Sequence, residues 1–323
     1  MFLAVHLLRP PEQDILDHLG SQLEPDIRLT TGDEIPYDIQ VLVGGRPSRE
    51  QFLASPQLRT LIIPFTGLPD TTRDLLLEYD HVAAHNLHHN AIPVAEIAIA
   101  LMLAAARGLL PMDRSLRTHD WRPRYEPNPG LLLDGATVLI LGYGAIGQRV
   151  AQVCRSLGMR VIGIRRKETS VSGAEFYPLS ALPTLLPQTQ VLMVCLPGTV
   201  ETSGLIGTEE LALLPPGAVL VNVGRGPVVD QAALYTALRD GHLHSAGLDV
   251  WYNYPDTIES RANTPPSDYP FHKLDNVVMS PHHAGGAGIK EVERRRMEAL
   301  AELLNAISRG ETVPNQVNLD NGY

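Results

Sequence analysis

A glycine-rich turn between a strand pattern and a helix pattern constrains the fold of this chain more than any other segment. The segment 142–147 reads Gly-Tyr-Gly-Ala-Ile-Gly, follows the apolar run Val138–Leu141, and leads into a helical pattern over Ala145–Leu157. In this context the glycines permit a tight turn, backbone approach to a pyrophosphate, and close packing of helix on strand. The helix N-terminus offers amide donors to phosphates. The segment predicts dinucleotide binding, with candidate contacts at Gly142, Tyr143, Gly144, Ala145, Ile146 and Gly147.

Apolar runs of strand length alternate with helical patterns along the whole chain, and this alternation predicts parallel sheets in an α/β fold. We expect strands at Leu3–Leu8, Val41–Val43, Leu61–Ile63, Val82–His85, Thr137–Leu141, Arg160–Ile164, Val191–Cys195, Ala218–Val223, Ser245–Leu248 and Val277–Met279. We expect helices at Glu12–Leu19, from about Pro93 to about Leu110, and at Ala145–Leu157, Leu179–Leu186, Glu209–Leu213, Gln231–Asp240 and Gly288–Ser308.

Composition narrows the class of protein. A length of 323 residues suggests two domains, and 44% apolar with 19% charged residues is typical of a folded chain. The net charge of −10 and the lack of a long basic run argue against nucleic-acid binding. The longest apolar stretch, Ile97–Ala106, is too short to cross a membrane. Two cysteines, Cys154 and Cys195, cannot build a disulfide framework, so we expect a reducing, cytoplasmic location.

Basic residues stand where the ribose of a dinucleotide would be recognised. An acidic residue about 20 positions past the glycine motif would bind the 2′-hydroxyl of NAD. This chain has Arg165, Arg166 and Lys167 there, with no carboxylate before Glu168. A guanidinium can hold a 2′-phosphate through two hydrogen bonds, whereas a carboxylate would repel it. We therefore expect NADP(H) to be preferred over NAD(H), although three basic residues are also common in a solvated turn.

Three further segments with chemically useful side chains follow expected strands. They are Val221–Pro227 with Arg225, Leu248–Pro255 with Asp249, and Met279–Gly286 with His282. In open α/β sheets, ligands bind beyond the carboxyl ends of the strands. We expect Arg225 and His282 to face the same crevice as a bound nicotinamide.

These segments resemble the D-isomer-specific 2-hydroxyacid dehydrogenase family, and in particular its glyoxylate/hydroxypyruvate reductases. The likeness is continuous from about Thr137 to Gly286, and it extends more loosely to Val94-Ala95-Glu96. It implies a Rossmann dinucleotide-binding domain at 106–286 inserted in a flavodoxin-like α/β substrate-binding domain made of 1–105 and 287–323. It also implies a homodimer built around the helix that starts near Pro93, and a small anionic 2-oxo or 2-hydroxy acid as substrate.

The resemblance also implies roles for individual residues. Arg225 would bind the substrate carboxylate, His282 would exchange a proton with the oxygen on C2, and Asp249 would help hold the nicotinamide amide. The loop of Phe65, Thr66 and Gly67 would grip the carboxylate from the other domain, although it is less glycine-rich than is usual in the family. The remaining expected cofactor contacts are Cys195, Leu196, Pro197, Thr202, Val223, Gly224 and Gly285. No metal is expected, because His85, His88 and His89 have no carboxylate or cysteine beside them.

One position departs from the family. A catalytic glutamate that orients the histidine normally precedes the proline after the aspartate, and here Tyr254 precedes Pro255. Tyr254 would act by orienting His282 through its hydroxyl, or Asp256 or Glu259 would fold back into that role. Two alternatives stay open: a dinucleotide-binding protein with little or no turnover, and an oxidoreductase that acts on another small anion without proton transfer, as formate dehydrogenases do.

Overall fold

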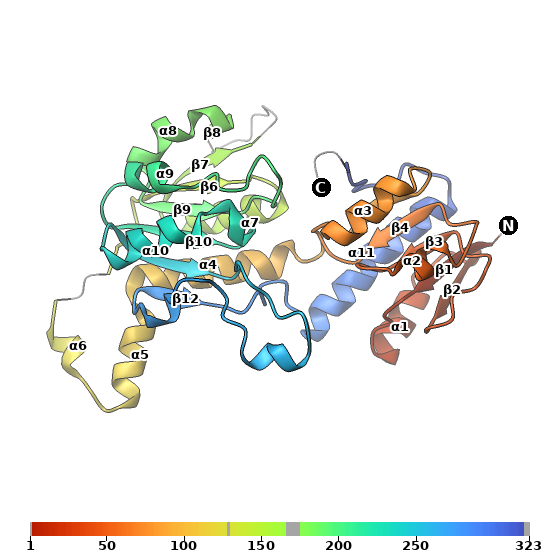
Figure 1. Ribbon diagram of the computed structural model, residues 1–323, viewed down its shortest axis with the longest axis horizontal. Helices are drawn as coiled ribbons and strands as arrows, with labels where there is room; N and C mark the ends of the chain where they lie inside the picture. The colour runs from red at the N-terminus through yellow and green to blue at the C-terminus, as the bar shows by residue number, and fades with distance from the viewer. Residues whose placement is uncertain (1, 128–129, 166–174, 320–323) are drawn as a thin grey trace. The chain divides into compact units, whose positions relative to one another are not determined.

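The computed structural model describes residues 2–127, 130–165 and 175–319. The chain forms two compact units, one made of Met1–Asn90 with Gly286–Tyr323 and the other of Ala91–Gly285. In sequence, the second unit therefore lies between the two parts of the first (Figure 1). The first crossing between units falls at Asn90–Ala91 and not at the expected 105–106. The reason is that the helix α4 (Ala91–Arg107) packs against helix α7 and strands β10 and β11 of the second unit.

The first unit is a five-stranded parallel sheet covered by helices on both faces. Its strands, in the order β2-β1-β3-β4-β5, are Ile27–Thr31, Leu3–Leu7, Val41–Val43, Thr60–Ile63 and Ala83–Asn86. This is the strand order of flavodoxin-like folds, the fold class that the family resemblance implied for this part of the chain. Helices α1 (Gln13–Gly20) and α11 (Lys290–Ser308) bury their apolar residues on one face, and α2 (Arg49–Leu53) and α3 (Asp70–Glu78) on the other (Figure 1).

The second unit is a seven-stranded parallel sheet in the order β12-β11-β10-β9-β6-β7-β8. Counted from β6, this is the 3-2-1-4-5-6 order of dinucleotide-binding folds with one strand added at an edge. The strands β6 to β12 are Thr137–Leu141, Arg160–Ile164, Glu175–Tyr177, Val191–Val194, Ala218–Asn222, Leu243–Leu248 and Val277–Met279. Helices α4 and α7 (Ala145–Ser156) cover one face. Helices α8 (Leu182–Leu185), α9 (Thr208–Leu213) and α10 (Gln231–Arg239) cover the other.

Helices α5 (Leu109–Arg117) and α6 (Arg122–Tyr125) follow α4 and extend away from the sheet of the second unit (Figure 1). No residue of α5 is buried, and several large apolar side chains of this arm face solvent: Leu109, Leu116, Trp121 and Tyr125. Among the described helices, none alone has the length and hydropathy of a membrane span. Helices α4 and α5 reach that length and hydropathy only when they are taken together, and the chain bends by 71° between them.

Candidate active site

The glycine turn has the geometry that close approach of a phosphate requires. Gly142 adopts φ +94°, and a Cβ there would lie 2.8 Å from the carbonyl oxygen of Cys195. A Cβ on Gly147 would lie 2.3 Å from the carbonyl oxygen of Gly142. Gly144, by contrast, faces open space, with no described atom within 4 Å of an added Cβ. Two glycines thus allow the turn itself, and the third leaves its backbone accessible to a ligand.

The amide donors at this turn divide into two groups. The amides of Gly142 and Tyr143 both donate to the carbonyl oxygen of Ile164, at 3.2 Å, and so they hold the turn against β7. The first-turn amides of α7, which include those of Ala145 and Ile146, have no partner within the helix. No side chain described here caps that helix at Gly144. The α7 N-terminus therefore fits a dinucleotide pyrophosphate, which would be held there by backbone amides.

Tyr143 contributes to the core with its side chain. Its ring is buried and meets Phe176 edge to face with centroids 4.7 Å apart, and Arg155 donates to its hydroxyl at 2.8 Å. The side chain of Tyr143 thus belongs to the core and its amide is bonded to Ile164, and its contact with a cofactor stays a prediction.

Arg165 lies at the carboxyl end of β7, where the ribose is expected. Its guanidinium carbon lies 4.7 Å from the centroid of Phe176, so the side chain stacks on an aromatic ring that Tyr143 supports from its edge. Arg166 and Lys167, which the sequence analysis placed beside it, lie outside the described residues.

The loops after β6, β9 and β10 contact one another. The amide of Cys195 donates to the carbonyl of Leu141 at 2.8 Å, and a Cβ on Gly224 would lie 2.4 Å from the carbonyl oxygen of Leu196. Strand β6 lies between β7 and β9, which is the switch point where ligands bind in such sheets. Burial raises the pKa of the Cys195 thiol to about 12, so Cys195 stays a thiol at neutral pH.

Two other expected cofactor contacts shape these loops. The hydroxyl of Thr202 donates to the carbonyl of Pro197 at 2.7 Å and accepts from the amide of Thr199 at 2.8 Å, so it closes its own loop. Val223 is buried after β10, and its amide donates to the carbonyl of Val194 at 3.1 Å. Gly285, the last expected contact, is half-buried at the end of the second unit.

Arg225 is held by the loop after β10. The side chain of buried Asn222 donates to the carbonyl of Arg225 at 2.9 Å and accepts from the amide of Gly224 at 3.0 Å. The Arg225 guanidinium donates to the carbonyl of Gly224 at 2.8 Å. A Cβ on Gly198 would lie 3.1 Å from the Arg225 side chain, so the absence of a side chain there makes room for the arginine stem. Gly198 was not among the expected site residues, because a single glycine in a loop forms no specific sequence pattern.

His282 and Tyr254 meet through their rings. His282 follows β12 with φ +56°, a left-handed conformation uncommon for a residue other than glycine. The ring centroids of His282 and Tyr254 are 5.4 Å apart at 55°. Burial raises the pKa of Tyr254, while the hydrogen bond from the Trp251 amide and the charge of Arg225 act to lower it. Arg225, Tyr254 and His282 follow the neighbouring parallel strands β10, β11 and β12, whose carboxyl ends share one edge of the sheet, and the rings of Tyr254 and His282 meet there.

Asp249 is 1% exposed and binds the loop that carries His282. Its Oδ1 accepts from the hydroxyl of Ser280 at 2.5 Å and from the amide of His283 at 2.9 Å. The amide of Ala284 donates to both carboxylate oxygens, at 3.3 and 3.2 Å. The carboxylate that the sequence analysis assigned to the nicotinamide amide thus has partners within its own unit.

Phe65, Thr66 and Gly67 follow β4 in the first unit, whereas Arg225, Tyr254 and His282 belong to the second. The hydroxyl of Thr66 donates to the side-chain oxygen of Asn90 at 2.5 Å, and the Asn86 side chain donates to the carbonyl of Thr66 at 2.6 Å. The loop is therefore fixed by the polar segment that precedes α4.

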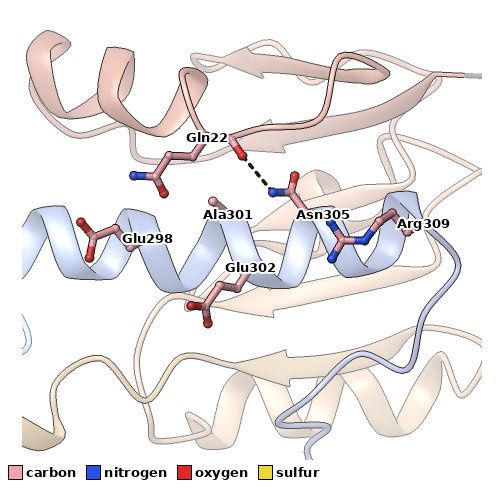
Figure 2. A pocket seen from close by; sticks show the side chains of 6 residues that line it. All are labelled: Gln22, Glu298, Ala301, Glu302, Asn305 and Arg309. Carbon is pink, nitrogen blue, oxygen red and sulfur yellow. Dashed lines mark hydrogen bonds between the residues drawn. The ribbon is translucent and has the colours of Figure 1, made fainter.

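A surface hollow of about 460 Å³ lies elsewhere on the first unit, between α11 and the end of α1 (Figure 2). Its lining consists of Gln22, Glu298, Ala301, Glu302, Asn305 and Arg309. The side chain of Asn305 donates to the carbonyl of Gln22 at 2.8 Å, and Arg309 forms ion pairs with Glu24 and Glu311. None of the predicted site residues lines this hollow, and its polar groups join α11 to the rest of the unit.

Comparison with known proteins identifies the family. Residues 99–284, which include most of the second unit, match the model of the D-isomer specific 2-hydroxyacid dehydrogenase NAD binding domain. A glyoxylate reductase of Korarchaeum cryptofilum is 40% identical over 230 residues, which cover 69% of this chain and 65% of that protein. A D-3-phosphoglycerate dehydrogenase of Mycobacterium leprae is 35% identical over 274 residues, which cover 84% of this chain and 49% of that protein. The chain thus matches 49–65% of the length of these curated relatives.

Solved structures extend the likeness to both units. A D-isomer specific 2-hydroxyacid dehydrogenase from Xanthobacter autotrophicus Py2, in complex with NADPH and MES, covers 100% of both chains with a TM-score of 0.81 and 28% identity. An NADPH-dependent glyoxylate/hydroxypyruvate reductase from Sinorhizobium meliloti, in complex with NADP and malonate, covers 100% of this chain and 98% of that chain. Its TM-score is 0.74 and its identity 25%. The sequence motifs, both sheets and these matches agree: this chain belongs to the D-isomer specific 2-hydroxyacid dehydrogenase family.

Proposed function

We propose that this protein is an oxidoreductase that transfers hydride between a nicotinamide dinucleotide, preferentially NADP(H), and C2 of a small 2-oxo or 2-hydroxy acid. The observation that carries the proposal is the contact between the rings of Tyr254 and His282, with Arg225 after β10, the next strand but one from β12, at the sheet edge that also bears the glycine turn. Glyoxylate and hydroxypyruvate are the first substrates to test, since proteins similar to this chain are named glyoxylate reductase and glyoxylate/hydroxypyruvate reductase.

Two side chains of this protein would act directly on the substrate. Arg225 would bind the substrate carboxylate through its planar fork, which keeps its charge at every working pH. The bound cofactor supplies the hydride. As C2 receives it, the electron pair of the C=O bond moves to oxygen, and His282 would give that oxygen a proton. In the oxidative direction His282 would take the proton back.

Turnover with a panel of 2-oxo acids tests this proposal. Purified protein is mixed with NADPH or NADH and each acid, and loss of the reduced-nicotinamide absorbance is followed. We expect turnover with at least one acid, and faster turnover with NADPH. Nucleotide binding without turnover on any acid would favour the second candidate, a dinucleotide-binding protein with little activity, which Tyr254 in the position of the usual glutamate motivates.

The cofactor preference predicts the effect of changing Arg165. One charge-assisted hydrogen bond is worth about 1.5–3 kcal/mol, so Arg165→Asp should lower kcat/KM for NADPH relative to NADH by roughly 10–150-fold. Arg160→Gln is the control, because Arg160 lies at the amino end of β7, the opposite end from Arg165, and forms an ion pair with Glu175. An unchanged ratio in Arg165→Asp would remove Arg165 from the account of cofactor choice.

We also propose that the protein is a homodimer joined through α4, α5 and the residues after them. Support comes from the apolar side chains of Leu109, Leu116, Trp121 and Tyr125, which face solvent on one arm of the single chain. Leu116→Glu with Trp121→Glu should therefore halve the mass measured by light scattering during size-exclusion chromatography. Leu77→Glu, an equally exposed apolar site on α3, should leave that mass unchanged. A wild-type protein that elutes as a monomer would contradict the proposal.

A further inference from the structure

The loop that carries His282 is fastened at several points to a buried carboxylate. Asp249 accepts hydrogen bonds from the hydroxyl of Ser280 and from the amides of His283 and Ala284. The amide of Ser280 also donates to the carbonyl of Leu248 at 2.8 Å. His282 lies between these anchors in its left-handed conformation. Such a conformation in a residue other than glycine persists where the surrounding contacts determine it.

Trp251 joins this loop to Tyr254. Its indole Nε1 donates to the carbonyl of Ser280 at 2.8 Å, and its backbone amide donates to the hydroxyl of Tyr254 at 3.0 Å. Trp251 is 4% exposed, and its ring packs against Phe271 with centroids 6.1 Å apart. One buried residue therefore holds both the loop of His282 and the ring that lies against the His282 imidazole.

We propose that Trp251 and Ser280 are positioning residues that set the orientation of the His282 imidazole against Tyr254. The inference rests on the proposed function for its kinetic consequence. Orientation of His282 would then come from the backbone of its own loop and from the face of an aromatic ring. The hydroxyl of Tyr254 serves a different purpose, because it accepts from Trp251 and thereby holds the Tyr254 ring in place.

Two disruptive substitutions and one restoring substitution separate this role from simple support of the fold. Trp251→Phe keeps an aromatic ring against Phe271 and removes the Nε1 donor. Ser280→Ala removes only the hydroxyl bound to Asp249, and Ser280→Thr restores a hydroxyl at the same position. The matched control is Tyr252→Phe, which removes the 2.8 Å hydrogen bond from the hydroxyl of half-buried Tyr252, the residue after Trp251, to the carbonyl of Val229.

We expect Trp251→Phe and Ser280→Ala each to lower kcat for 2-oxo acid reduction by roughly 10–100-fold, because small misplacements of a reacting group carry losses of this order. The KM for NADPH should change less than about twofold, and Ser280→Thr should recover most of the lost kcat. Amide hydrogen exchange of the peptide over 281–285 should quicken in both damaged variants, since the anchors of this loop are weakened. Tyr252→Phe should leave kcat and this exchange at the wild-type values.

The outcomes distinguish this inference from the proposed function. If the wild-type protein turns over no 2-oxo acid, the proposed function fails, and the exchange measurement alone still tests the anchoring. If the wild-type protein is active while Trp251→Phe and Ser280→Ala keep its kcat and its exchange rates, the positioning role is overturned. A loss of kcat that Ser280→Thr does not recover would also overturn it.

Discussion

Replacement of His282 by asparagine is expected to lower kcat for 2-oxo acid reduction by roughly 10²–10⁴-fold, the usual contribution of a positioned proton donor. Asparagine keeps a planar polar group and tolerates the left-handed backbone that His282 adopts at φ +56°. The substitution therefore removes proton transfer with little disturbance of the loop. Binding of NADPH, measured by fluorescence titration, should stay within about threefold of the wild-type value, since the glycine turn is untouched.

The neighbouring histidine supplies a control for this substitution. His283 has an exposed side chain, and its contribution to the loop is the backbone amide that donates to Asp249. His283→Asn should therefore keep kcat close to that of the wild-type protein. Equal losses in His282→Asn and His283→Asn would indicate damage to the loop, and full activity of His282→Asn would exclude His282 as the acid/base.

Replacement of Arg225 by alanine is expected to lower kcat/KM by about 10²–10³-fold, in the range found when one partner of a buried charged pair is removed. The loss should appear with every substrate that carries a carboxylate beside C2. The kcat/KM of Arg225→Lys should lie between the values of Arg225→Ala and the wild-type protein, because lysine keeps the charge but cannot form the paired hydrogen bonds of a guanidinium. Steady-state kinetics at one pH measure all three proteins.

A second arginine of the same unit tests whether loss of positive charge alone explains the effect. Arg239 is exposed at the end of α10, where it pairs with Asp240 at 2.7 Å. Arg239→Ala should leave kcat/KM within about twofold of the wild-type value, as is usual for an exposed ion pair. If Arg225→Ala behaves in the same way, the substrate carboxylate binds elsewhere.

Local patterns were sufficient to predict most of the two sheets. Strands β3, β6, β7 and β12 have the expected bounds. Strands β3 and β6 are buried at every residue, and a parallel strand covered on both faces forms a nearly continuous apolar run. Strands β2 and β8 escaped prediction because both are edge strands in which no residue is fully buried, so neither has a continuous apolar run. Helix α5 has no buried residue, so the single chain offers no packing reason for its apolar side chains.

Contacts between distant residues explain what the sequence could not predict at the candidate site. Arg225 and His282 were expected beside one another because the carboxyl ends of parallel strands share one edge of the sheet. The hydrogen bond from the Trp251 indole to the carbonyl of Ser280 joins residues 29 positions apart, and neither local sequence contains a pattern that predicts it. The same holds for Gly198, whose importance depends on the Arg225 stem that packs over it. Burial of α4 against β10 and β11 likewise placed the domain crossing at Asn90.

Transfer of a deuterium label tests the central claim most directly. The wild-type protein is given NADPH with deuterium in both positions at C4 of the nicotinamide, together with glyoxylate or hydroxypyruvate, and the product is analysed by mass spectrometry and NMR. We expect one deuterium on C2 of the hydroxy acid for each NADPH oxidised, and no label in the product of His282→Asn over the same interval. A hydroxy acid without deuterium on C2, or no hydroxy acid from either substrate, would contradict direct hydride transfer to C2 at this site.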